Sequence, residues 1–276
     1  MADKYEMRVT AFIDILGFKE HIKSSVDNKG NDVTDKIELI HSAYQTIRDV
    51  WDLDAPQSNN LLRVDKKSKI ITTFSDSLVI SFKLDGESEI FFTLLELKWM
   101  LMRLVYKGIL CRGAVTYGKL YHDEKMLFGP ALVDAYTFES KVALYPRIIL
   151  EKSIIDLATV SGRHSPSEEK EYIENLLQKD SDGMYYIDFF MKAQSELDDP
   201  TYDFPTYIDT LSDFIRLGLN VYKMKPDVKI KYLWLKERYN DLVQVCNNKK
   251  NIEFLKKSGE SELADYYSSL KKINPY

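Results

Sequence analysis

Two aspartates lie inside short apolar segments of this chain. Asp14 falls in the run Ala11–Phe18, and Asp76 falls in the run Ile70–Ile80. Burying a carboxylate costs several kcal/mol unless something pairs with it, so two of them are most simply explained by a shared cation. Carboxylate oxygens without a Cys/His cluster favour Mg²⁺ or Mn²⁺, ions that usually also bind substrate phosphates. The pair therefore predicts metal-dependent nucleotide chemistry.

The composition limits the class of protein. The chain has 276 residues, 45% of them hydrophobic, which suffices for a well-buried core. Its net charge of -5 argues against a general nucleic-acid binder, which would present a basic surface. The two cysteines, Cys111 and Cys246, form neither a disulfide framework nor a zinc motif, and the first residues lack the apolar core of a signal peptide. With no apolar run long enough for a membrane span, we expect a cytoplasmic protein.

Periodicity and turn residues predict an α+β fold. The elements expected in the first part of the chain are a strand at Arg8–Ile15, helices at Phe18–Ser25 and Asp35–Trp51, extended segments at Leu61–Val64, Lys69–Phe74 and Leu78–Leu84, a helix at Glu87–Tyr106, a strand at Ile109–Tyr117, a helix over 129–144 and a strand at Arg147–Leu150. Ser75-Asp76 would form the turn of a hairpin. This order predicts an antiparallel-centred sheet with helices packed on one face.

The second part of the chain has a different pattern. Residues 165–182 are polar and favour helix or loop, and Met184–Phe190 could form a last strand. Three helices are expected after it, at Tyr207–Lys223, Pro226–Asn247 and Asn251–Lys272. We therefore predict a catalytic domain over residues 1–192 and an α-helical appendage over residues 193–276.

Several segments, in order, resemble the class III nucleotidyl cyclase catalytic domain. Phe12–Phe18 matches the family's Phe-x-Asp-Ile-x-Gly-Phe strand, and Asp76 stands where its hairpin carries a second metal aspartate. Arg112–Gly118 loosely matches its Arg-x-Gly-x-His-x-Gly strand. Leu127-Phe128-Gly129 and Phe138-Glu139-Ser140 match the segments around its next helix. The similarity covers about residues 8–155 and implies a ferredoxin-like core.

The departures from that family are equally informative. Its transition-state asparagine and arginine fall on Val133 and Thr137, which cannot do the same work. Its two purine-reading positions fall on Thr72 and Met126, which do not suit adenine or guanine. The pattern resembles the bacterial cyclases of the Pycsar anti-phage system, which make cyclic UMP or cyclic CMP.

The resemblance implies a metal site and a phosphate site. Asp14 and Asp76 would bridge two Mn²⁺ or Mg²⁺ ions, with the Ile15 carbonyl as a further ligand. The alternative is that both carboxylates only stabilise turns. Arg112, in an apolar strand, needs an anionic partner, which is either the substrate's phosphates or a structural carboxylate. The backbone N–H groups at Phe18 begin a helix and could bind phosphate.

Two further residues have weaker substrate roles. Tyr44 lies on the apolar face of its helix, where its ring could stack on a pyrimidine or serve as a core or dimer contact. Arg147 could replace the missing transition-state cation, although an arginine that starts a strand is commonly a surface residue. The four histidines are scattered, and none needs a catalytic role.

The resulting hypothesis is a pyrimidine nucleotide cyclase that converts UTP or CTP to the 3′,5′-cyclic monophosphate and pyrophosphate. The resemblance implies a homodimer and a separate effector protein that reads the cyclic nucleotide, with no nucleic-acid or membrane partner. The alternatives are a purine cyclase, a diguanylate cyclase, disfavoured because Ser75-Asp76-Ser77 lacks that family's signature, and a degenerate cyclase fold acting as a nucleotide sensor or scaffold.

Overall fold

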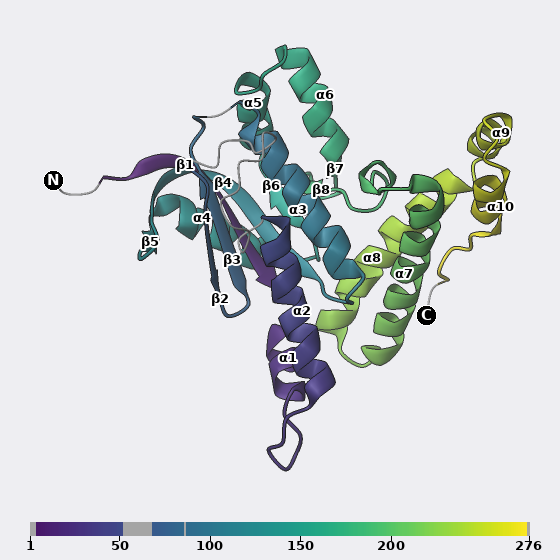
Figure 1. Ribbon diagram of the computed structural model, residues 1–276, viewed down its shortest axis with the longest axis horizontal. Coiled ribbons are helices and arrows are strands. Elements are labelled where there is room, and N and C mark those ends of the chain that lie inside the picture. The colour runs from purple at the N-terminus through teal and green to yellow at the C-terminus, as the bar shows by residue number, and fades with distance from the viewer. Residues whose placement is uncertain (1–3, 52–67, 86, 275–276) are drawn as a thin grey trace. The chain divides into compact units, whose positions relative to one another are not determined.

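The chain divides into two compact units, Met1–Ile187 and Asp188–Tyr276. The computed structural model describes residues 4–51, 68–85 and 87–274 (Figure 1). The expected extended segment at 61–64 lies outside the described residues. The boundary expected after residue 192 stays a prediction.

The first unit holds the sheet and six of the helices described in the chain. Its strands are β1 (Glu6–Ile15), β2 (Ile70–Phe74), β3 (Ser77–Phe82), β4 (Cys111–His122), β5 (Leu127–Phe128), β6 (Ile148–Leu150), β7 (Leu177–Lys179) and β8 (Tyr185–Ile187). Its helices are α1 (Phe18–Ser24), α2 (Thr34–Val50), α3 (Glu89–Val105), α4 (Pro130–Lys141), α5 (Lys152–Val160) and α6 (Pro166–Leu176).

The centre of the sheet has ferredoxin-like topology. Its strands lie in the order β2-β3-β1-β4, and each neighbouring pair is antiparallel. Along the chain, α1 and α2 follow β1, the hairpin β2–β3 comes next, and α3 leads into β4, which is the split βαββαβ arrangement. The predicted α+β ferredoxin-like core is confirmed, including the hairpin turn at Ser75-Asp76.

The sheet is larger than the sequence indicated. Strand β4 continues through Gly118 to His122 instead of ending at Tyr117, and its extension pairs with β5. Beyond β4, the sheet adds β6 in parallel and then β8 and β7. Strand β7 lies in a segment that was expected to be helix or loop.

Helices cover both faces of the sheet, not one as predicted. Helix α4 packs on β1 and β4, where Phe12 and Val79 join Ala135 in one apolar cluster. The alternating neighbours Ala11 and Ile13 are just as buried, on the face over which α2 and α3 lie in Figure 1. The continuous apolar run of β1 is typical of a strand covered on both sides.

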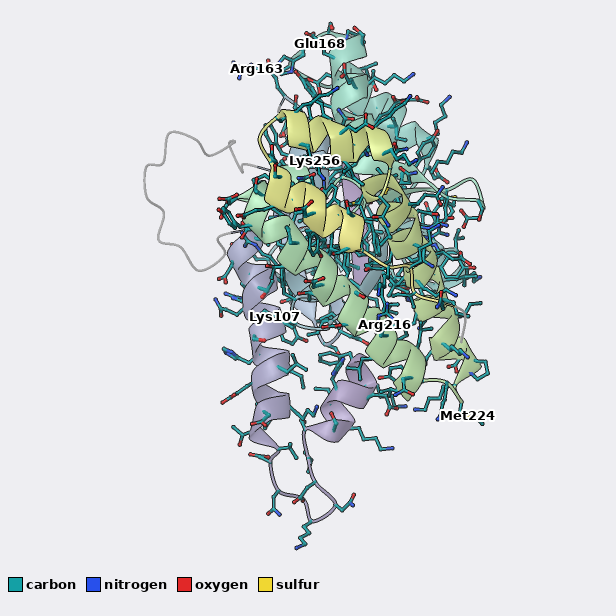
Figure 2. The ribbon with its side chains drawn as sticks, turned by 90° about the vertical axis from the view of Figure 1, so that its right-hand side faces the viewer. Lys107, Arg163, Glu168, Arg216, Met224 and Lys256 are labelled. Atoms are coloured by element: carbon teal, nitrogen blue, oxygen red, sulfur yellow. The ribbon has the colours of Figure 1, made fainter. Side chains whose placement is uncertain are left out.

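The second unit is helical, with α7 (Pro200–Val221), α8 (Pro226–Cys246), α9 (Lys249–Lys257) and α10 (Ser261–Ser269) after a short 3₁₀ turn, η1 (Gln194–Glu196). Helix α7 begins before the predicted Tyr207 because Asp199 caps it, accepting hydrogen bonds from the N–H groups of Thr201 and Tyr202. The predicted last helix is two helices, α9 and α10, which lie side by side (Figure 2). Gly259, at φ 87°, breaks the helix between them.

None of the described helices combines the length and apolar character that crossing a membrane requires.

The close approach of β4 to β1 yields a test of this packing. A Cβ at Gly113 would lie 2.6 Å from the Phe12 carbonyl oxygen and 3.0 Å from Ile13 Cγ1. We expect Gly113→Ala to lower the free energy of unfolding by about 1–3 kcal/mol, since the strands must move apart. Gly118→Ala, in the same strand, is the control, because its Cβ would make an ordinary 3.4 Å contact with Ala131. Equal losses for the two variants in urea unfolding would contradict this packing.

Candidate active site

The end of β1 lies against the β2–β3 turn and brings Asp14 and Asp76 together. Asp14 is the Cα partner of Ser77, and the Ile15 N–H donates to the Asp76 carbonyl at 2.9 Å. Both aspartates are half-buried. Residues from two distant parts of the sequence thus place their carboxylates at one edge of the central sheet.

The turn that carries Asp76 is held by an aromatic pair. Ser75 adopts a left-handed backbone conformation, with φ 52°, which a non-glycine residue rarely adopts. Its carbonyl accepts a hydrogen bond from the Tyr44 hydroxyl. The Tyr44 ring packs edge-on against the Phe18 ring, with 6.1 Å between the two ring centroids. Burial and the nearby Asp76 charge raise the pKa of Tyr44. Tyr44 and Phe18 therefore lie beside the aspartates, where Tyr44 supports the Asp76 turn.

The first helix starts directly at this edge. Gly17 precedes α1 with φ 75°, a left-handed conformation that glycine adopts at little cost. It lets the chain turn from β1 into the helix immediately after Asp14 and Ile15. This short connection explains why the motif has glycine between its aspartate and Phe18.

Arg112 lies across from Asp14. The two residues are Cα partners in the β1–β4 ladder, and Arg112 Nε lies 3.7 Å from Asp14 Oδ2. The same Nε forms an ion pair with Glu139 Oε1 on α4. The arginine thus has the structural carboxylate partners that the sequence left as one possibility, and part of its side chain is exposed.

Glu139 is a site residue that sequence reasoning missed. It is 2% exposed and follows Ala131 and Ala135 at four-residue spacing on the buried face of α4. Burial raises its pKa to about 7, and the charges of Asp14 and Asp76 add to this rise, while Arg112 opposes it. An acid at a position that helical periodicity assigns to the core was the available signal.

The oxygen donors at this edge are suited to a cation. The carboxylates of Asp14, Asp76 and Glu139 gather there around the Arg112 guanidinium. Hard oxygen donors fit Mg²⁺ or Mn²⁺. Within the described residues no group of three or more His, Cys, Asp or Glu side chains is arranged to hold an ion alone. An ion here would need backbone or substrate oxygens to complete its shell.

Two more of the predicted substrate residues, Thr72 and Met126, lie on β2 and in the turn before β5. The Thr72 hydroxyl on β2 lies 2.8 Å from His122 Nε2 at the end of β4. Met126 follows in the turn before β5, where it is 49% exposed and its N–H donates to the Asp123 carboxylate. His122 is a second residue that the sequence did not single out, and one histidine among four gave no signal for it.

The structure corrects the role of Arg147. Its side chain is fully buried, and its guanidinium forms ion pairs with Asp180, at 2.6 Å, and with Asp182. Both carboxylates come from the turn between β7 and β8, so this arginine ties that turn to β6. It has a structural role in place of the predicted catalytic one, and it is not the surface residue of the alternative reading.

Val133 and Thr137, where the resemblance placed the family's transition-state groups, lie on α4. Val133 is 61% exposed, and the Thr137 hydroxyl donates to the Val133 carbonyl of its own helix at 2.7 Å. Neither side chain supplies a charge or an amide.

No protein-family model matches the chain, and no curated protein matches it. Among solved structures it is similar to a bacterial light-regulated adenylyl cyclase, at 11% identity and a TM-score of 0.37 over 56% of this chain and 80% of that one. The adenylyl cyclase CyaB from P. aeruginosa is 12% identical, with a TM-score of 0.40, and the match covers 67% of this chain and 95% of that one. A rhodopsin-guanylyl cyclase catalytic core with converted specificity, in complex with ATPαS, is 12% identical, with a TM-score of 0.41. That match covers 67% of this chain and 96% of the other. Similarity at this level leaves activity and substrate to be inferred from the site.

The buried Arg147 ion pairs give a stability prediction. Arg147→Ala leaves Asp180 buried without this partner and should lower the free energy of unfolding by about 3–5 kcal/mol. Arg163→Ala is the control, because Arg163 has a 75% exposed side chain at the surface (Figure 2) and should leave stability nearly unchanged. Urea unfolding of both variants measures the difference. An Arg147→Ala variant that was as stable as the control but had no catalytic activity would restore the catalytic assignment.

The raised pKa of Glu139 gives a pH prediction for the metal-free protein. Since its folded-state pKa of about 7 exceeds the usual 4.5, folding favours the protonated form. Its contribution to stability is complete below pH 4.5 and is lost as the pH rises through about 7. The free energy of unfolding of wild type should therefore fall more steeply over this range than that of Glu139→Gln, which cannot titrate. Parallel pH profiles in urea unfolding with a chelator would contradict the shift.

Proposed function

We propose that this protein is a nucleotidyl cyclase. The observation that carries the proposal is the meeting of Asp14, Asp76 and Arg112 at one edge of the ferredoxin-like sheet. In the reaction, the ribose 3′-oxygen attacks the α-phosphorus of a nucleoside triphosphate. The bond to the bridging oxygen breaks, pyrophosphate leaves, and the 3′-hydroxyl proton passes to solvent or to a carboxylate.

The aspartates are the proposed ligands of Mn²⁺ or Mg²⁺, two ions in each site, with the Ile15 carbonyl as a further ligand. Bound ions would stabilise the charge on the attacking and leaving oxygens. The gathering of the Asp14, Asp76 and Glu139 carboxylates in one half-buried place supports this assignment, since the charges of Asp14 and Asp76 help to raise the pKa of Glu139 there.

Arg112 is the proposed phosphate-binding residue. Its Nε faces Asp14 and Glu139, so these carboxylates hold the guanidinium at the edge of the site. Its two terminal nitrogens can then bind the triphosphate. Glu139 would thus position Arg112 without touching the substrate.

The proposed substrate is UTP or CTP, and the product cyclic UMP or cyclic CMP. Thr72 and Met126 offer no charged group to read a purine, and by resemblance to the Pycsar cyclases the protein would act in bacterial anti-phage defence. By the same resemblance it would be a cytoplasmic homodimer, in which the aspartates of one subunit face Thr72 and Met126 of the other. A separate effector would read the product.

A second candidate is a catalytically degenerate nucleotide sensor or scaffold. It is favoured by the exposed Val133 and by Thr137, which supply no transition-state charge. Arg147 forms ion pairs with Asp180 and Asp182, so it does not supply the missing transition-state charge. A sensor would bind nucleotide without releasing pyrophosphate.

The test of the cyclase is turnover of ATP, GTP, CTP and UTP, each with Mn²⁺, with products resolved by mass spectrometry. We expect a cyclic pyrimidine nucleotide from wild type, and at least about a 100-fold lower rate from Asp14→Ala and Asp76→Ala, since metal ions supply several kcal/mol of stabilisation. Asp156→Ala, on the exposed side of α5, is the control.

Each alternative has its own outcome in this experiment. Cyclic AMP or GMP would identify a purine cyclase. Binding without any product would identify the sensor. Full activity in both aspartate variants would overturn the assigned metal site.

A further inference from the structure

A chain of four side chains runs from a buried arginine to Thr72. Arg8 Nε donates to Ser81 Oγ at 2.9 Å, Ser81 Oγ lies 2.8 Å from His122 Nδ1, and His122 Nε2 lies 2.8 Å from Thr72 Oγ1. Arg8, Ser81 and His122 are buried, whereas Thr72 is half-buried. The chain therefore ends at the one member that can meet a ligand.

The direction of every hydrogen bond in this chain follows from Arg8. A guanidinium is always protonated and only donates, so the Ser81 oxygen accepts from it. The buried Ser81 hydroxyl must then donate its own hydrogen, and its other hydrogen-bond partner is His122 Nδ1. With Nδ1 accepting, a neutral imidazole carries its hydrogen on Nε2 and donates to Thr72.

His122 is suited to accept a hydrogen bond at Nδ1 and to donate one at Nε2. Burial and the nearby Arg8 charge lower the pKa of His122 to about 4, while Asp123 opposes the change. The imidazole is thus neutral at pH 7, with one donor and one acceptor. The Thr72 oxygen accepts one hydrogen bond from this imidazole, so the Thr72 hydroxyl hydrogen is not used in the contact with His122 and is available to an acceptor on a ligand.

We propose that this chain leaves the Thr72 hydroxyl hydrogen to be donated to the group on C4 of the pyrimidine, so that the enzyme selects UTP over CTP. The inference rests on the proposed function and on Thr72 as a base-reading residue. Uracil presents a carbonyl oxygen at C4, which accepts. Cytosine presents an amino group there, which cannot accept, so the Thr72 hydrogen would lose the partner that uracil provides.

The first test compares kcat/KM for UTP and CTP. We expect wild type to favour UTP by about 10- to 100-fold, the usual cost of an unmade hydrogen bond. Thr72→Val keeps the shape and removes the hydroxyl, and it should bring the ratio close to one, chiefly by slowing UTP. Thr73→Val, at the exposed next position of β2, is the matched control and should keep the wild-type ratio.

The second test examines the relay without relying on turnover. ¹⁵N NMR of the histidine ring should show His122 neutral at pH 7, with the hydrogen on Nε2. Ser81→Ala removes the donor to Nδ1, so the hydrogen can move there and Nε2 can accept from Thr72. The preference for UTP should then fall or reverse. A His122 that is charged, or that carries its hydrogen on Nδ1 in wild type, would overturn the relay.

The two proposals fail in different ways. Equal kcat/KM for UTP and CTP, or a preference for CTP, would overturn the inference and leave the cyclase intact. If no triphosphate turned over, the cyclase proposal would fail, and equilibrium binding of UTP and CTP to wild type and Thr72→Val would decide the inference. Equal affinities would then overturn it, and tighter UTP binding that Thr72→Val abolishes would support it.

Discussion

The pairing of β1 with both β3 and β4 is the constraint on which the candidate site depends. One register places Asp14 opposite Ser77, beside the turn of Asp76, and opposite Arg112 on the other side. Because side chains alternate between faces, a slip of one residue would move Asp14 to the other face of the sheet. The close approach of Gly113 to β1 allows this register. The site is thus a consequence of strand pairing at the centre of the fold.

The same pairing gathers carboxylates in one half-buried place. Asp14 and Asp76 meet at a half-buried edge, and Glu139 is brought to it by the packing of α4, while Arg112 is the guanidinium paired with both Asp14 and Glu139. The cost of this arrangement is visible in the raised pKa of Glu139. A structure selected for stability alone would avoid such a cluster. Under the proposed function, a bound cation would reduce the repulsion among these carboxylates.

The parts of the structure that could be predicted depend on local pattern. The apolar runs around Asp14 and Asp76, with Ser75-Asp76 between two of them, indicated the strands, the hairpin and the antiparallel centre. Contacts between distant residues gave no such signal. His122 lies 50 residues from Thr72 in the sequence, and Arg147 lies 33 residues from Asp180. The residues around each of them give no indication of its partner. Glu139 was partly predictable. Its helical position indicated that it would be buried, but not which residues it would contact.

Two of the charged networks in the first unit, those of Arg112 and Arg8, use arginine in different ways. Arg112 keeps part of its side chain exposed, and its charge can act on a ligand directly. Arg8 is buried and meets no ligand, but its permanent protonation sets the direction of the hydrogen bonds that end at Thr72. A hydroxyl or an amide in place of Arg8 could both donate and accept, and the direction would be lost. Selection by a hydrogen-bond donor also needs no charged side chain at the base, which fits the uncharged hydroxyl of Thr72.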